Sequence, residues 1–291
     1  MSLEQVTVRV PATSANLGPG YDCLGVALQL HNGVTVQRTR RRKSQPAIVE
    51  AVVERFFSVI GRRPFPFDWS IDGEVPRSRG LGSSVTVRLG LLTGLNALAG
   101  NPCDRQQLFE LCSELEGHPD NAAPAQFGGF VVAVDGGRYF RFPVEAKLKF
   151  ILLIPDFEVA TDQARQVLPD QVPLADAAGN AARVAAITAA MATGKYRKLT
   201  GLFDDALHQP YRASLIPGFA EMIKAGIAAG ALGGFLSGSG STTACVALSH
   251  TRKIGAAMAK VFQEANPESP APRLVTVSAD NRGTRILGKL G

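Results

Sequence analysis

Apolar residues recur along the chain with two periods, and each period predicts one kind of element. Residues 5–10 alternate as Gln-Val-Thr-Val-Arg-Val with one apolar face, which is typical of a strand that ends at Pro11. Further strands are predicted at residues 28–38, 69–71, 127–134, 150–154, 244–248 and 273–277. Apolar residues three or four apart predict helices over residues 48–60, 85–98, 101–117, 177–193, 199–207, 219–229 and 253–265. Strands and helices are therefore expected throughout the chain.

A glycine-rich loop leads into the helix predicted at residues 85–98. It consists of Pro76, Arg77, Ser78, Arg79, Gly80, Leu81, Gly82, Ser83, Ser84 and Val85. The first N–H groups of a helix lack partners and lie at the positive end of its dipole, so they suit an anion. The glycines let the backbone approach a ligand closely, and the arginines add positive charge. Phosphate binding is predicted, although a loop capped by Ser83 or Ser84 with nothing bound would use the same residues. The lysine of a Walker A loop is missing, which disfavours the common P-loop fold.

A second loop that could contain functional residues follows the first strand, at residues 11–25. Small and polar residues dominate it, and its best hydrogen-bonding side chains are Asn16 and Asp22. Loops that follow strands often contain binding or catalytic residues. The alternative is a tight turn in which Asn16 and Asp22 bond to nearby backbone.

Two acidic residues lie where a helix disfavours them. Glu114 and Glu116 fall in the last turn of the helix predicted at residues 101–117, where the helix dipole is already negative. A bound cation would reverse this penalty, whereas exposed acids would cost about a few tenths of a kcal/mol. A compact polar group follows at once: His118, Asp120 and Asn121.

The composition allows a sizeable hydrophobic core, and the net charge favours an anionic partner. The 291 residues are 45% hydrophobic and 19% charged; we expect two domains, 1–147 and 148–291. A net charge of +6 fits an anionic partner such as a nucleotide, without selecting one. The four cysteines form no CxxC pair, so we expect reduced thiols, a cytoplasmic location and no zinc site. We expect no signal peptide and no membrane span.

Three segments, taken in chain order, resemble the GHMP small-molecule kinases (galactose, homoserine, mevalonate and phosphomevalonate kinases). Residues 76–85 are similar to the Pro-x-x-x-Gly-Leu-Gly-Ser-Ser-Ala signature of that family, with Val85 in place of the final alanine. Residues 11–25 resemble its first motif, and residues 233–242 resemble its glycine-rich third motif. The resemblance implies a two-domain α/β fold. Its N-terminal half would be like ribosomal protein S5 domain 2, and its C-terminal half would be ferredoxin-like.

Within this superfamily the detail is similar to the homoserine kinases. The segments that match are 14–22, 118–121, 161–165 and 236–240. The resemblance implies phosphorylation of the L-homoserine hydroxyl by ATP, in threonine biosynthesis, by a homodimer that binds neither nucleic acid nor membrane. It implies that residues 76–85 hold the ATP phosphates and that Ser84 and Glu116 hold Mg²⁺. The implied substrate contacts are Asn16, Asp22, His118, Asn121, Thr161, Arg165, Arg212 and the backbone near Gly238.

The chemistry implied by this resemblance depends on positioning. Asp22 would bind the substrate ammonium, and an arginine would bind its carboxylate through two hydrogen bonds. Arg165 would steady the γ-phosphate, and Asn121 would hold the attacking hydroxyl. No general base is matched to that hydroxyl. Direct attack is therefore expected, because phosphoryl transfer can run mainly on positioning and charge stabilisation.

Other functions stay open at this point. A GHMP kinase acting on mevalonate, a sugar or shikimate is one, although Thr161, Arg165 and Arg212 suit an amino acid better. The basic run at residues 38–43 could belong to a nucleic-acid-binding protein. No aromatic residues are interleaved there, however, so a solvated hairpin tip fits it better. A catalytically inactive sensor is a third possibility. No segment matches the adenine contacts of the family.

Overall fold

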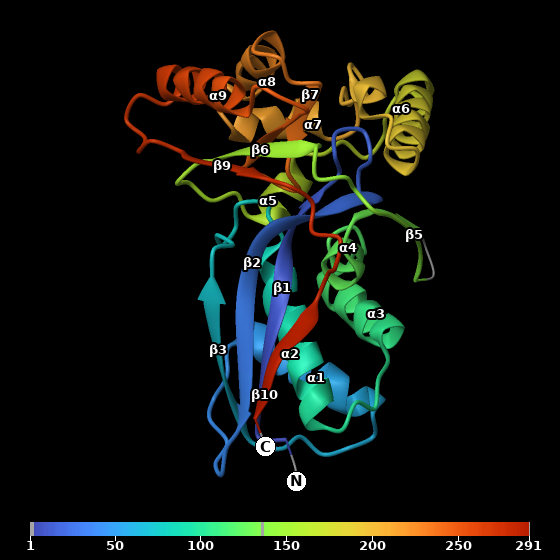
Figure 1. The fold of residues 1–291 in the computed structure, drawn as a ribbon, viewed down its shortest axis with the longest axis vertical. Coiled ribbons are helices and arrows are strands. Elements are labelled where there is room, and N and C mark those ends of the chain that lie inside the picture. Colours follow the sequence, from blue (N-terminus) through green and yellow to red (C-terminus); the bar gives the residue numbers. More distant parts are fainter. Residues whose placement is uncertain (1–2, 135–136, 291) are drawn as a thin grey trace.

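Two β-sheets with helices packed on them make up the molecule (Figure 1). The computed structural model describes residues 3–134 and 137–290. The first sheet has the strand order β10-β1-β2-β4-β5, with β3 also paired to β2. Its strands are β1 (Gln5–Ala15), β2 (Leu24–Arg38), β3 (Phe67–Gly73), β4 (Phe130–Val134), β5 (Arg138–Phe142) and β10 (Arg285–Leu290). The second sheet has the order β7-β8-β6-β9, formed by β6 (Lys149–Ile154), β7 (Gly233–Leu236), β8 (Thr243–Ala247) and β9 (Arg273–Val277).

The helices fall into two groups, one for each sheet. Those that accompany the first sheet are α1 (Ala47–Val59), α2 (Ser83–Leu98), α3 (Arg105–Glu116) and α4 (Ala122–Phe127). Those of the second half are α5 (Thr161–Gln166), α6 (Leu174–Ala192), α7 (Gln209–Arg212), α8 (Phe219–Ala228) and α9 (Thr251–Ala265). Within the described residues, no helix is both long and apolar enough to cross a membrane.

Strand β6 shows how the second sheet is buried on both faces. Phe150 and Leu152 belong to a core that also includes residues of β1, β2 and α6. Ile151 and Leu153 belong to a separate core under α8 and α9. Because side chains alternate across a strand, an unbroken apolar run is what such a two-sided strand requires. The core shared by both halves of the chain fixes one half against the other.

Helix α2 lies directly on β2 because two of its residues have no side chain. A Cβ at Gly90 would lie 2.5 Å from Val34 Cγ2, and a Cβ at Gly94 would lie 2.5 Å from Val36 Cγ2. Either side chain would push the helix away from the sheet. The same helix buries Val85 in the core of the first half. The residue that departs from the family signature therefore faces the core, and the start of α2 is held firmly on the sheet.

Pro11 does not end the first strand, contrary to the prediction. Strand β1 continues to Ala15, and its pairing with β2 shifts register between Pro11 and Ala12. At such an irregularity the missing N–H of proline costs little. The segment predicted as a loop is therefore partly strand, and the chain first bends at Asn16.

The prediction of a helix at residues 199–207 is wrong. A short 3₁₀ helix at Tyr196–Leu199 ends where it was expected to begin, and Gly201 then takes a φ of +75°. The Asp205 carboxylate accepts three backbone N–H groups at 2.6 to 2.9 Å, from Leu207, His208 and Gln209. Asp205 therefore holds the turn that leads into α7, and the apolar spacing before it reflects packing rather than a helix.

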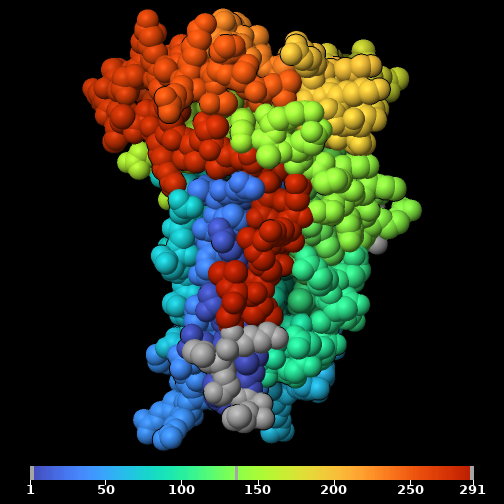
Figure 2. Space-filling view, viewed as in Figure 1, coloured from blue at the N-terminus to red at the C-terminus, as the bar shows by residue number. Residues whose placement is uncertain are grey.

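The proposed division at residue 147 falls between β5 and β6, and it stays a proposal. Strand β10 lies beyond that point, yet it pairs with β1 in the first sheet. Figure 2 shows this C-terminal segment, in red, running from the second half down beside the blue strands of the first sheet. The two halves are therefore tied together by the chain itself as well as by the shared core.

Candidate active site

The glycine-containing segments singled out in the sequence meet where the two halves of the molecule join. The Ser237 hydroxyl donates to the Gly80 carbonyl oxygen at 2.7 Å. It also lies 2.7 Å from the Ser14 hydroxyl. Each of the three residues comes from a different segment, so the segments are bonded to one another.

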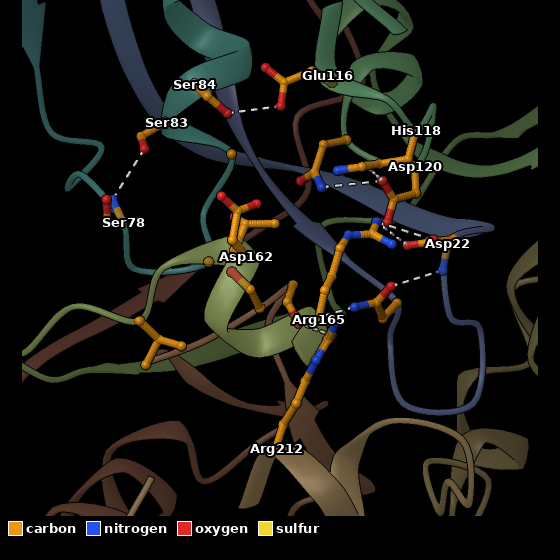
Figure 3. A pocket seen from close by; sticks show the side chains of 18 of the residues that line it. Asp22, Ser78, Ser83, Ser84, Glu116, His118, Asp120, Asp162, Arg165 and Arg212 are labelled. Carbon is orange, nitrogen blue, oxygen red and sulfur yellow. Dashed lines mark hydrogen bonds and ion pairs between the residues drawn. The ribbon is translucent and has the colours of Figure 1, made fainter. Parts of the chain in front are cut away.

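These segments line a pocket of about 330 Å³ (Figure 3). All of the substrate and metal candidates lie on its wall: Asn16, Asp22, Ser84, Glu116, His118, Asn121, Thr161, Arg165, Arg212 and Gly238. From the glycine-rich loop, Ser78, Gly80, Gly82 and Ser83 join them. Asp120, named in the sequence only as part of a polar group, also lies on the wall, and so do four residues that the sequence did not single out: Arg88, Val159, Asp162 and Ser239. Both halves of the chain thus contribute to one site.

The start of α2 reaches this pocket without a side-chain cap. Gly82 is the N-cap residue, and no side chain of the described residues caps the helix. The first intrahelical bond is from the Thr86 N–H to the Gly82 carbonyl oxygen, at 3.0 Å. The Ser83 hydroxyl instead accepts the Ser78 N–H at 3.3 Å, which excludes the alternative of a Ser83 cap. The N–H groups of residues 83–85 have no partner within the helix and are suited to an anion.

Position 82 admits only glycine. Its φ of +68° is costly for any residue with a Cβ, and that Cβ would lie 2.1 Å from Thr13 Oγ1. The Thr13 hydroxyl donates to Asn121 Oδ1 at 2.6 Å. The absence of a side chain at Gly82 thus lets the loop approach the hydrogen bond that orients Asn121.

The two arginines of the loop point in different directions. Arg79 Nε donates to the Pro155 carbonyl oxygen at 2.9 Å, and its Nη1 lies 3.2 Å from Glu158 Oε1. Its guanidinium therefore ties the loop to the second half of the chain, whereas Arg77 lines a neighbouring pocket. The remaining loop residues, Pro76, Leu81 and Val85, lie outside the walls of both pockets. What the loop offers to a phosphate is mainly backbone N–H groups.

Ser84, Glu116 and Arg88 form a connected group beside the loop. The Ser84 hydroxyl donates to Glu116 Oε2 at 2.9 Å, and Arg88 forms an ion pair with Glu116 Oε1. Arg88 follows Ser84 by one helical turn, and this spacing is the signal that could have found it. Glu114 instead pairs with Arg55 at 2.8 Å on the surface. The oxygen atoms of Ser84 and Glu116 are of the kind that Mg²⁺ takes, so these two residues fit such an ion.

Asn16 connects two segments of the site. Its Oδ1 accepts the Asp22 N–H at 3.0 Å, and its Nδ2 donates to the Gly238 carbonyl oxygen at 3.0 Å. The first bond is the local turn contact that the sequence allowed, and the second reaches the other half of the chain. The Asn16 side chain therefore both stabilises its own turn and positions the segment around Gly238.

Asp22 is paired with Arg165 in this structure. Arg165 Nη2 lies 3.1 and 3.2 Å from the two carboxylate oxygens, and Nη1 donates to the Tyr21 hydroxyl at 2.9 Å. Burial lowers the pKa of Arg165 more than any other single cause, but the charge and hydrogen bond of Asp22, together with Tyr21, outweigh burial and raise it. The Tyr21 ring centroid lies 5.8 Å from Arg165 Cζ and 5.2 Å from Arg212 Cζ. Tyr21, which the sequence did not single out, thus supports both arginines.

Arg212 is the third arginine on the pocket wall, with Arg88 and Arg165, and the groups that accept its hydrogen bonds are neutral. It is 2% exposed. Its guanidinium donates to the carbonyl oxygens of Ala164 at 2.9 Å and Gly238 at 3.3 Å, and to His208 Nδ1 at 3.3 Å. Among the described residues, no carboxylate lies within ion-pair distance of it. A buried guanidinium without a counter-charge suits an anionic group of a ligand.

His118, Asp120 and Asn121 form one hydrogen-bonded group, as their adjacency suggested. His118 Nδ1 lies 2.6 Å from Asp120 Oδ1, and Asn121 Nδ2 donates to the same oxygen at 3.3 Å. Burial lowers the pKa of His118, but the hydrogen bond and charge of Asp120 outweigh burial and raise it. Ligand atoms of Asp22, His118 and Asp120 lie within 4.8 Å of one another. Each of them already has a protein partner, so a metal ion there would have to displace one.

A second pocket, of about 460 Å³, adjoins the first. The two share Ser78, Ser83 and Ser84 of the glycine-rich loop. Most of the other wall residues are apolar: Pro46, Ile48, Trp69, Ile71, Val75 and Val87. They come from three segments that are distant in the sequence, which explains why no local motif pointed to them.

Comparison with known proteins covers both halves of the chain. The family model of the GHMP kinases N terminal domain matches residues 47–129, and that of the GHMP kinases C terminal matches residues 187–266. A homoserine kinase of Moorella thermoacetica is 40% identical over 271 residues, 88% of this chain and 92% of the relative. One of Thermosynechococcus vestitus is 42% identical over 252 residues, 81% and 84% of the two chains. The crystal structure of homoserine kinase from Cytophaga hutchinsonii matches with a TM-score of 0.88 at 27% identity, over 98% of each chain.

These matches confirm the expected two-domain α/β fold of the GHMP kinases. They also confirm an enzyme that uses ATP to phosphorylate an alcohol. The matched regions extend over most of the chain, 88% of it for the Moorella thermoacetica relative. The chain belongs to the homoserine kinase family of the GHMP kinases.

Proposed function

We propose that this chain transfers the γ-phosphoryl group of ATP to the side-chain hydroxyl of L-homoserine, giving ADP and O-phospho-L-homoserine for threonine biosynthesis. One observation supports this substrate above all. The pocket at the start of α2 contains both a carboxylate, Asp22, and a buried guanidinium without a counter-charge, Arg212. An amino acid with a hydroxyl side chain has the ammonium, the carboxylate and the nucleophile that such a pocket would receive.

The ATP phosphates would lie against the free N–H groups at the start of α2. The adjoining apolar pocket then supports a place for adenine, because it shares Ser78, Ser83 and Ser84 with the phosphate region. Trp69 and Ile71 would supply flat and aliphatic surface for the base. This assignment fills the one part of ATP recognition for which the sequence offered no candidate.

Mg²⁺ would be held by the Ser84 hydroxyl and the Glu116 carboxylate. When bound, such an ion neutralises charge on the transferred phosphoryl group. In this structure Arg88 balances the charge of Glu116. Arg88 also lines the pocket, so it would lie close to the phosphates as an additional cation.

The substrate would bind between Asp22 and the two arginines. Its ammonium would compete with Arg165 for Asp22, and Arg165 would then be released toward the γ-phosphate. Arg212 would bind the carboxylate. Asn121, whose Oδ1 is held by the Thr13 hydroxyl, would orient the substrate hydroxyl for attack. These residues bind and orient, which is the main requirement of phosphoryl transfer.

We propose direct attack of the hydroxyl without a dedicated base. Asp120, the carboxylate of the 118–121 segment, is already hydrogen-bonded to His118 and Asn121.

A cytoplasmic location and a homodimer are also part of the proposal. The location is supported by the four free cysteines, and gel filtration with light scattering would test the dimer.

A coupled ADP-release assay tests the substrate. The purified chain is given ATP, Mg²⁺ and, one at a time, L-homoserine, mevalonate, galactose and shikimate, and the rate without acceptor is subtracted. Homoserine is expected to give by far the highest rate. An absence of homoserine-dependent ADP release, with release on another of the four alcohols, would assign the chain to a different member of the GHMP kinases.

A further inference from the structure

His208 is a buried histidine next to the pocket that none of the proposed steps uses. It immediately precedes α7 and stands one helical turn before Arg212. Its side chain is fully buried, and its ring centroid lies 5.4 Å from that of Tyr21. A buried titratable side chain in contact with a substrate-binding arginine calls for a physical explanation.

The neighbours of His208 fix the position of its proton. Nε2 lies 2.8 Å from the Gly18 carbonyl oxygen and 3.5 Å from Asp205 Oδ2. Both are acceptors, so Nε2 must bear the hydrogen. Nδ1 lies 3.3 Å from Arg212 Nη1, which can only donate, so Nδ1 must be free to accept. A neutral ring with its hydrogen on Nε2 satisfies all of these contacts. Burial lowers the pKa of His208, which also favours the neutral ring.

The contacts of Arg212 show what this acceptor achieves. Nε donates to the Ala164 carbonyl oxygen, and Nη1 donates both to His208 and to the Gly238 carbonyl oxygen. The Tyr21 hydroxyl is a further hydrogen-bond partner of the guanidinium. The groups that hold the guanidinium are therefore all neutral. A carboxylate in place of His208 would hold it as well, but would neutralise the charge that a ligand carboxylate needs.

We infer that His208 is a positioning residue, which presents Nδ1 to hold Arg212 in place while leaving its positive charge for the substrate carboxylate. This inference rests on the proposed function, since it concerns the amino-acid carboxylate. Gly18 and Asp205 fix the ring, the ring fixes Arg212, and Arg212 faces the pocket. His208 thereby links Gly18, in the first glycine-containing segment, to Arg212, the substrate-binding arginine of the second half.

Two substitutions separate the two nitrogens of the ring. In His208→Asn, Oδ1 can take the place of Nδ1 and still accept from Arg212, but the side chain is too short to reach Gly18. In His208→Gln, the amide can reach Gly18 but leaves no acceptor at the position of Nδ1. Both variants lose one hydrogen bond in the same buried site, so their melting temperatures serve as matched controls for stability.

His208→Gln is expected to raise the KM for L-homoserine roughly tenfold or more, the effect of losing a hydrogen bond to a charged group. Its kcat and its KM for ATP are expected to change little, and His208→Asn is expected to keep the homoserine KM within about threefold. Equal homoserine KM values in the two variants would overturn the inference. If the wild type released no ADP with homoserine, the proposed function would fail instead.

A second measurement needs no variant of His208 to fold. A long-range ¹H–¹⁵N spectrum of the wild-type chain, labelled at histidine, distinguishes the two tautomers and the imidazolium. The chain has four histidines, so the signals can be assigned by substituting the other three. A neutral ring protonated at Nε2 is expected at pH 7. A ring protonated at Nδ1, or a charged ring, would overturn the inference.

Discussion

Asp120 is the residue that separates direct attack from base catalysis. Its carboxylate is 2% exposed and accepts from His118 and Asn121. If it only orients these neighbours, Asp120→Asn should lower kcat about tenfold or less, because the amide oxygen can still accept. Base catalysis is worth roughly a hundredfold to ten-thousandfold. Steady-state kinetics and a homoserine binding isotherm distinguish the two mechanisms. A loss of three or more orders of magnitude in kcat, with unchanged affinity for homoserine, would show that Asp120 acts as a general base.

The His118–Asp120 pair predicts a pH dependence of stability. The pKa of His118 is raised from its usual value of 6.5, so the folded protein binds its proton more tightly than the unfolded chain does. The stabilisation is therefore complete below pH 6.5 and is lost as pH rises through the folded pKa. We predict that the unfolding free energy of the wild type falls toward that of His118→Asn over this range. Urea denaturation from about pH 5.5 to about pH 8.5 measures the difference. A difference that stayed constant or grew with pH would contradict the prediction.

Most of the site residues that the sequence identified belong to local motifs, although Arg212 does not. Asn16, Asp22 and Asn121 lie in segments whose residue types and spacing already indicate binding. Tyr21 and His208 act through contacts with residues about 140 and 190 positions away, respectively. Such contacts depend on how the two halves pack, and no local pattern reports them.

At the scale of the element, the loop before α2 depends on a left-handed glycine. Gly82→Ala should cost about 1–2 kcal/mol for the backbone alone, and its Cβ would also meet Thr13 Oγ1 at 2.1 Å. Gly100→Ala is the matched control, because Gly100 has a φ of +89° but open space around its Cβ. We predict that only Gly82→Ala raises the KM for ATP and lowers kcat, whereas both variants lower the melting temperature. A Gly82→Ala enzyme with wild-type kinetics would rule out this function of the loop.

Elements with strong apolar periodicity were predicted well from the sequence. Helix α3 begins after Asp104, whose carboxylate and the Gln107 side chain form the expected capping box. Strands β5 and β10 and the helix α4 were not predicted. β5 and β10 lie at the edges of the first sheet, where no described residue of either strand is fully buried, so neither shows a clear alternation. Only pairing with β4 and β1 makes them strands.

At the scale of the whole molecule, the site exists only where the two halves join. Ser237 contributes most directly, because its hydroxyl contacts Ser14 and Gly80 of the first half. Ser237→Ala should cost about 1–3 kcal/mol of stability and raise the KM for both substrates. Ser241→Ala is the control, since Ser241 is equally buried and donates to Phe157 within the second half. Comparable kinetic effects of the two variants would show that the junction itself does not matter.

The sequence predicted two α/β halves, but not how they combine. The return of β10 to the first sheet and the core shared around β6 both join residues more than 100 positions apart. Pairing between such distant segments is decided by the packing of the whole molecule, because local sequence constrains only neighbouring residues. Recognition of the family motifs supplied what periodicity alone could not.

We propose that the pocket selects an amino acid with a hydroxyl side chain. This selectivity is tested by comparing kcat/KM for L-homoserine with that for two analogues: 4-hydroxybutyrate, which lacks the ammonium, and 3-aminopropan-1-ol, which lacks the carboxylate. 4-Hydroxybutyrate would leave Asp22 paired with Arg165, so Arg165 would not be released toward the γ-phosphate, and 3-aminopropan-1-ol would leave Arg212 without a carboxylate. We expect kcat/KM to fall roughly a hundredfold or more for each analogue. Use of either analogue as efficiently as L-homoserine would contradict the proposed selectivity.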